Sequence, residues 1–162
     1  MNLINEFNKG DSSMLDKPKE GIYSSSQISY LILSLIPSLL GTKEYIQNLL
    51  FVCHCDFIKM QGSPLITTSF YAFPFGPVEI EMFKKWRGIK GPITERKESS
   101  VSLPHKFFIK DILQKWESFS PNQLNHILRD SSFSYGRPWS LCYREGWGEL
   151  IPNELIMKEN IN

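Results

Sequence analysis

Apolar side chains recur at helical spacing along residues 43–60, which is the clearest periodic pattern in the chain. The stripe consists of Ile46, Leu49, Leu50, Cys53, Phe57 and Met60. Its members fall at i, i+3, i+4, i+7, i+11 and i+14, as on one face of an α-helix. Further apolar residues lie off the stripe, so much of the helix girth is apolar. We therefore predict a buried central helix, with Thr42 as its N-cap and Gly62 just beyond its end.

The helical repeat recurs in several other segments. They are residues 24–35, 77–86, 104–119, 120–129 and 137–144, followed by a last helical turn or two after Ile151. Ser120, Pro121 and Gln123 match a capping box, in which the serine and glutamine side chains bond free backbone N–H groups at a helix start. Together with the central helix, these patterns predict about six helices.

One segment departs from the helical repeat. Residues 65–73 (LITTSFYAF) are dominated by β-branched and aromatic residues, which favours a strand or half of a hairpin. The Pro-Phe-Gly-Pro sequence that follows ends it, and Pro77 is predicted as the first residue of the next helix. Residues 87–103 are polar and predict a surface loop. The expected fold class is mainly α: a compact bundle of about six helices around a central helix, with a small β-hairpin or strand insertion.

Length and composition predict one cytoplasmic domain. The chain has 162 residues, enough for a hydrophobic core, and its three cysteines do not suggest a disulfide framework. Residues 1–22 are polar and are predicted as a poorly ordered N-terminal segment, with the domain at residues 23–162. We expect no signal peptide, because residues 1–13 have neither a basic nor an apolar stretch. We expect no membrane association, because the most apolar run, residues 28–41, is shorter than the ~20 residues that span a bilayer.

The Cys53-His54-Cys55 triplet is the first candidate for chemistry, because zinc sites use these side chains. Successive helical residues diverge by about 100°. Cys53 should therefore face the apolar stripe, His54 a polar edge and Cys55 a flank, so both thiolates cannot reach one ion. We interpret Cys53 as a core residue, Cys55 as a flank residue and His54 as a boundary residue, and we expect no metal or other cofactor.

Nucleophilic catalysis is the second candidate. His105 or His126 could approach Cys142 and act as its base. However, no nucleophile elbow, oxyanion turn or phosphate-binding glycine loop surrounds any cysteine or serine. We therefore expect that the protein is not an enzyme.

Nucleic-acid binding is the third candidate. A formal net charge of +1 provides no global field that would attract DNA, RNA or an anionic membrane. Residues 120–129 contain Asn122, Gln123, Asn125 and Arg129, which a recognition helix could direct at base edges. A capped surface helix explains the same residues, so we expect no nucleic acid as partner, and a DNA-binding autoregulator stays an alternative.

Aromatic residues form two groups, one in the β insertion and one near the C-terminus. Strand side chains alternate between faces, so burial of Phe70 would direct Tyr71 and Phe73 to the other side. Exposed aromatic side chains mark protein interfaces, although core packing is the alternative for each of them. The predicted partner-binding residues are Tyr71, Phe73, Phe75, Trp139, Tyr143 and Trp147.

Four motifs, taken in order, resemble the Panacea domain, also called the SocA-like antitoxin domain, of phage and bacterial proteins. They are YIQNLLFVCHCDF (45–57), GSPL (62–65), FYAFPFGPVEIEMF (70–83) and RPWSLCYREGWGELI (137–151). The resemblance covers about residues 26–157 and is most specific from Ala72 to Val78. Its structural motif residues are Ala72, Gly76, Pro77, Val78 and Pro138.

The resemblance implies a mainly α module that binds and neutralises a cognate toxin protein. Alternative roles on the same fold are a proteolysis adaptor or a phage or effector accessory protein, with a protease or other host protein as partner. One departure is visible: many family members carry Thr-His shortly before the Pro-Trp pair, where this chain has Asp130-Ser131-Ser132 and a longer loop. A contact role of that histidine would be lost or moved here.

Overall fold

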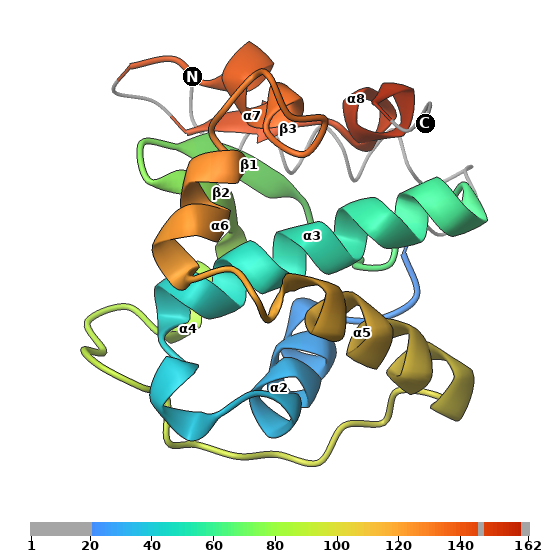
Figure 1. Ribbon diagram of the computed structural model, residues 1–162, viewed down its shortest axis with the longest axis vertical. Helices are drawn as coiled ribbons and strands as arrows, with labels where there is room; N and C mark the ends of the chain where they lie inside the picture. The colour runs from blue at the N-terminus through green and yellow to red at the C-terminus, as the bar shows by residue number, and fades with distance from the viewer. Residues whose placement is uncertain (1–20, 146–147, 160–162) are drawn as a thin grey trace.

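A mainly α fold with a small antiparallel sheet is seen in the computed structural model, which describes residues 21–145 and 148–159 (Figure 1). The elements are α2 (Ser25–Leu35), a 3-10 turn (Ser38–Leu40), α3 (Lys43–Gln61), β1 (Phe70–Phe73), β2 (Gly76–Glu79), α4 (Ile80–Lys85), α5 (Leu103–Trp116), α6 (Pro121–Ile127), α7 (Arg137–Cys142), β3 (Glu149–Ile151) and α8 (Asn153–Lys158). The mainly α character with a minor β part agrees with the prediction, and the described residues contain seven α-helices where about six were expected.

Helix α3 is buried around most of its girth. It packs against α2, α5, α6, α8 and β2. Figure 1 shows it crossing the molecule, with α2 and α5 on one side and the sheet, α7 and α8 on the other. The predicted caps are confirmed: the Thr42 hydroxyl accepts a hydrogen bond from the Tyr45 N–H, and Gly62 ends the helix in the left-handed conformation with a φ of 72°.

Two capping boxes fix the starts of α2 and α6. The Ser120 hydroxyl accepts from the Gln123 N–H at 3.1 Å, and the Gln123 side chain accepts from the Ser120 N–H at 2.7 Å, as predicted. Ser24 and Gln27 form the same reciprocal pair at the start of α2. These bonds satisfy N–H groups that lack a partner within the helix.

The most apolar run of the sequence does not form one continuous helix. Helix α2 ends at Leu35, and Pro37 precedes the separate 3-10 turn. Proline lacks the N–H that continues a helix, which explains the break. In the described part of the chain, no helix combines the length and the apolar character needed to cross a membrane.

The sheet has the strand order β2-β1-β3, with antiparallel pairing throughout. Strands β1 and β2 form a tight hairpin, in which Phe73 pairs with Gly76. Gly76 has a φ of +121°, a backbone conformation that residues other than glycine rarely adopt. Strand β3 was not predicted from the sequence: it brings residues 149–151 beside residues 70–72.

The prediction that Pro77 begins a helix is wrong. Pro77 lies in β2 and pairs with Ala72, and α4 begins three residues later at Ile80. Because β2 is an edge strand, the missing N–H of proline removes no bond from the sheet interior. The helix start is set instead by Glu79, whose carboxylate accepts from the N–H groups of Glu81 and Met82.

The start of the described chain is already tied to the domain. The N–H groups of Ile22 and Tyr23 both donate to the Leu65 carbonyl at 3.0 Å, and Tyr23 forms an isolated bridge with Ile66. The domain therefore includes Ile22, which the sequence analysis placed in the N-terminal segment. Residues 1–20 of that predicted segment lie outside the described residues.

Candidate functional site

The Cys53-His54-Cys55 triplet lies entirely within the core. None of the three residues is more than 2% exposed. The Ile66 N–H donates to His54 Nδ1 at 3.3 Å, so the other ring nitrogen carries the proton and donates to Asn153 Oδ1 at 2.9 Å. The assignments of His54 as a boundary residue and of Cys55 as a flank residue are wrong, because both are buried; α8 packs on α3 and contacts His54.

Burial keeps all three groups of the triplet neutral. It lowers the pKa of His54 to about 4, because the charged imidazolium is poorly solvated in the core. The same effect raises the pKa of both thiols, Cys53 and Cys55, far above neutral pH. Within the described ranges, no three His, Cys, Asp or Glu side chains group as metal ligands would. The triplet therefore serves packing and anchors α8.

A buried carboxylate, Glu79, was not recognised in the sequence. It is 0% exposed and accepts hydrogen bonds from Thr68 Oγ1 and from two N–H groups of α4. The side chain of Gln47 on α3 bonds both the N–H and the carbonyl of Glu79. Burial raises the pKa of the carboxyl, and its hydrogen bonds oppose this shift. All of these contacts hold β2 and α4 against α3, so Glu79 supports the hairpin base.

The two histidines considered as bases do not reach Cys142. His105 Nδ1 lies 2.6 Å from the Tyr23 hydroxyl, and His126 pairs with Asp130 at 3.4 Å. Neither histidine shares a hydrogen bond with Cys142 in the part of the chain that the structure describes. Burial also raises the pKa of the Cys142 thiol, which makes a thiolate nucleophile less available.

Three phenyl rings meet at the tip of the hairpin and form what we call the hairpin-tip surface: Phe73, Phe75 and Phe83. The rings of Phe73 and Phe75 are 5.8 Å apart and within 8° of parallel. Phe83, from α4, stacks on both, at 5.4 Å from Phe73 and 6.3 Å from Phe75. Phe75 is 50% exposed, whereas the other two are half-buried. The result is an aromatic surface held by two different elements.

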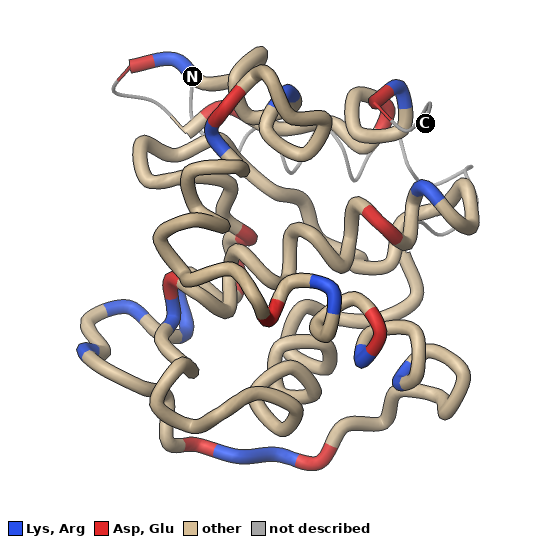
Figure 2. Tube along the Cα trace, viewed as in Figure 1, with Lys and Arg blue, Asp and Glu red and all other residues tan. Residues whose placement is uncertain are grey.

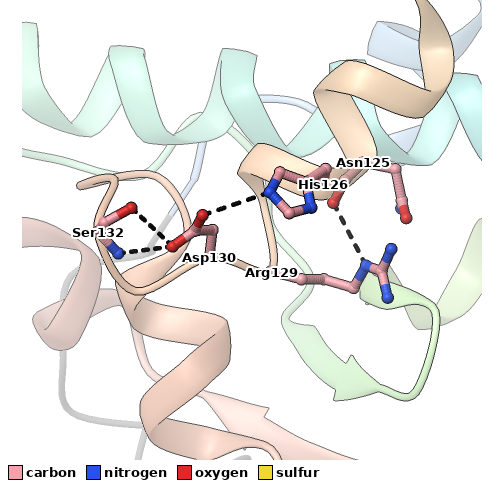
Figure 3. Close-up of polar contacts among 5 residues, drawn as sticks. All are labelled: Asn125, His126, Arg129, Asp130 and Ser132. Atoms are coloured by element: carbon pink, nitrogen blue, oxygen red, sulfur yellow. Dashed lines mark hydrogen bonds and ion pairs between the residues drawn. The ribbon is translucent and has the colours of Figure 1, made fainter.

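Helix α6 supports this tip from one side. Asn125 Nδ2 donates to the Phe75 carbonyl at 2.9 Å and lies 3.4 Å from Asn48 Oδ1 on α3. Arg129 Nε donates to the Asn125 carbonyl at 3.4 Å (Figure 3). Asn125, one of the residues that a DNA-recognition helix would present, is thus engaged by the hairpin, and α6 ends at Ile127, two residues before Arg129.

The loop that follows α6 has its own polar contacts. Asp130 accepts from both the N–H and the hydroxyl of Ser132, at 2.9 and 2.7 Å (Figure 3). These bonds, together with His126, hold the pKa of the Asp130 carboxyl below its ordinary value. Asp130 therefore carries a negative charge that the loop itself satisfies.

Helix α7 supports the tip from its other side. Trp139 Nε1 donates to the Phe73 carbonyl at 2.8 Å, and its ring stacks on Tyr143 at 4.6 Å. Both residues are half-buried. At Gly148, an added Cβ would lie 2.8 Å from the Phe73 ring, so a larger residue there would require that ring to shift. The two aromatic groups of the sequence thus meet at one end of β1.

The structure places the predicted interface residues in different environments. Tyr71 points away from Phe70 as expected, but it is only 1% exposed, so its assignment to an exposed surface is wrong. Trp147 lies outside the described residues. The remaining four, Phe73, Phe75, Trp139 and Tyr143, come together at the hairpin. Phe83 was not among the predicted interface residues, and Asn125 was considered only as a nucleic-acid contact. Both are visible in the sequence as an apolar and a polar residue, but only the fold brings them to the hairpin.

The predicted structural motif residues all occupy the hairpin or its support. Ala72, Gly76, Pro77 and Val78 are buried residues of β1 and β2. Pro138 is buried in the first turn of α7.

No protein-family model matches the chain, and no curated protein or solved structure matches it. The resemblance to the Panacea domain therefore rests on the four motifs alone.

Proposed function

We propose that this protein is an antitoxin-like module that binds a cognate toxin in the cytoplasm through the hairpin-tip surface. The observation that carries the proposal is the half-exposed ring of Phe75, held in a stack of three rings. Large aromatic side chains fixed at a surface are typical energetic centres of protein interfaces.

The tip is ordered before any partner arrives. Asn125 and Trp139 bond the carbonyls of Phe75 and Phe73 from two separate helices. Because these contacts already restrict the backbone, binding loses little further conformational entropy there. A scaffold of this kind suits occlusion of a partner, for which no catalytic group is required.

The toxin as partner is suggested by the motif resemblance, whereas the surface chemistry suggests protein binding in general. A proteolysis adaptor, or an accessory protein that binds a host protein, would use the same surface. The two classes differ in the partner that is recovered: a toxic protein encoded beside this gene, or a protease or signalling protein. Autoregulation by DNA binding would require a salt-dependent complex with upstream DNA.

Co-expression with the product of the neighbouring gene tests the proposal. We expect the neighbour to inhibit growth when expressed alone and to be neutralised in a stable complex with this protein. The Phe75→Ser substitution should weaken the complex by about 2 kcal/mol or more. Its free energy of unfolding should fall by only about 1 kcal/mol, because half of the ring is already exposed and the rest is lost from the stack with Phe73 and Phe83.

Phe107→Ser is the matched control. Phe107 is 57% exposed on α5 and has no part in the hairpin-tip surface. Loss of binding in the Phe75 variant alone would support the proposed surface. Equal loss in both variants, or the absence of any complex with the neighbour, would contradict it.

A further inference from the structure

Exposed cationic residues follow closely in sequence on Phe83, a ring of the hairpin-tip surface, and on Asn125, which holds that surface. Lys84 directly follows Phe83 on α4, and Arg87 lies in the turn two residues beyond the end of that helix. Arg129 comes one turn after Asn125, the residue that bonds the Phe75 carbonyl. All three side chains belong to exposed residues. Positive charge therefore lies at the end of α4 and just beyond α6, next in sequence to residues that form or hold the aromatic tip.

This positive charge is local. Residues 81–90 contain one acidic and four basic residues, whereas the whole chain is nearly neutral. Figure 2 shows the basic positions gathered on α4 and the loop that follows it. The ion pairs of the described chain involve Lys97, Lys115, His126 and Arg137, so none of the three flanking cations is neutralised by a neighbouring carboxylate within 4 Å.

Lys85 does not belong to this group of cations, because its side chain contacts another part of the molecule. Its ammonium lies 5.2 Å from the centre of the Tyr30 ring, and Lys97 lies 5.3 Å from the same ring. Lys85 is therefore directed toward Tyr30 on α2. Lys84, Arg87 and Arg129 are the side chains that could meet a partner seated on Phe75.

We infer that the hairpin-tip surface takes an acidic protein segment that carries an apolar or aromatic side chain. The apolar group would cover Phe75, and carboxylates on either side of it would pair with Arg87 and Arg129. Arginine binds carboxylates through two parallel N–H bonds, and charge complementarity of this kind selects partners and accelerates association. This inference rests on the proposed function and specifies the chemistry of the partner.

A protein segment fits these features better than single-stranded nucleic acid. Nucleic-acid grooves present several aromatic faces for successive bases along a continuous cationic track. Here Phe73 and Phe83 are half-buried in mutual contact, and Phe75 is the most exposed of the three rings, at 50%. The cations are few and lie to the sides of this one ring, which suits a single anchor between carboxylates.

The test uses the full chain and a fluorescent peptide of about 12 residues with one tryptophan between glutamates and aspartates. Binding is measured by fluorescence anisotropy and compared with the same peptide with lysines for acids, the same peptide with serine for tryptophan, and an oligothymidine. We expect the acidic tryptophan peptide to bind best, and more weakly when NaCl rises from about 50 to about 300 mM. Arg87→Glu and Arg129→Glu should each lower its affinity about tenfold.

Lys110→Glu is the matched control, because it reverses an exposed charge on α5. Three outcomes would overturn the inference: no binding of the acidic peptide, tighter binding of the oligothymidine, or equal effects of all three charge reversals. The inference would also be overturned if a neighbour-encoded partner lost affinity in the Phe75→Ser variant but not at higher NaCl or in the Arg87→Glu and Arg129→Glu variants. That result would leave the proposed function intact. If no neighbour binds but the acidic peptide does, the proposed function fails and the surface chemistry stands.

Discussion

The Cys53-His54-Cys55 triplet on α3 and the hairpin-tip surface differ in solvent access, and the difference is opposite to what their residue types suggest. The triplet contains two thiols and an imidazole, the side chains most often used in chemistry, yet burial and hydrogen bonds leave them neutral. The hairpin tip contains only phenyl rings, yet one of them is half exposed, and the nearby Lys84, Arg87 and Arg129 form no ion pair among the described residues. Residue type alone therefore says less about function here than solvent access does. A reactive group that is enclosed by its own fold acts as a structural group.

The largest expected effect is the loss of the His54 side chain. His54→Ala would leave a cavity beside α8 and remove the partner of the buried Ile66 N–H. We expect unfolding in urea to require about 4 kcal/mol less free energy than wild type. His126→Ala is the control, because His126 is a surface residue whose side chain is 72% exposed, and it should change little. Similar costs for both variants would show that the triplet is not buried as described.

Lowering the pH should reduce the free energy of unfolding by slightly less than the His54→Ala substitution does. Because burial lowers the pKa of His54 to about 4 from 6.5, only the unfolded chain binds this proton between those values. The His54 contribution is therefore complete above pH 6.5 and lost as pH falls to about 4, a total of about 3 kcal/mol. Urea unfolding of wild type and His54→Gln across this range isolates it.

The raised pKa of Glu79 acts in the opposite direction, because the folded state then holds the carboxyl proton more tightly. Glutamine at position 54 leaves Glu79 unchanged, so the Glu79 contribution is common to both proteins and cancels in their difference. A difference between the two proteins that stays constant from pH 7 to pH 4 would mean that His54 does not remain neutral in the fold.

At the hairpin, the expected effect on stability is smaller and comes from the backbone. Gly76→Ala would place a Cβ at a φ of +121° and 3.1 Å from Asn125 Nδ2. We expect a loss of about 2 kcal/mol in the free energy of unfolding. The control is Gly62→Ala, because Gly62 also has a positive φ but an added Cβ there would meet nothing within 4 Å. If Gly62→Ala costs as much, the contact between the tip and α6 is less tight than the structure shows.

Helix positions were predictable where the signal was local. The bonds made by Thr42, and by the Ser120 and Gln123 pair, involve residues within three positions, so the sequence is enough to find them. Predictions failed where a distant element decided. Pro77 is equally suited to a helix start and an edge strand, and its pairing with β1 selects the strand.

The candidate site was only partly predictable for the same reason. Phe73 and Phe75 were recognised as aromatic residues near a turn, but their stacking on Phe83 depends on where Glu79 starts α4. Tyr71 was assigned to a surface on the basis of alternation in a strand. Alternation decides which face a side chain is on, but it does not decide whether that face is covered.

The sequence by itself determined the mainly α character, the span of α3 and its caps, because periodicity and capping depend on neighbouring residues. Only the tertiary structure decided that His54 is enclosed, that β3 joins the hairpin and that Phe75 remains half exposed. Each of these depends on contacts between residues far apart in the chain. Solvent access at any one position is set by the packing of all the elements around it, and no local pattern contains that information.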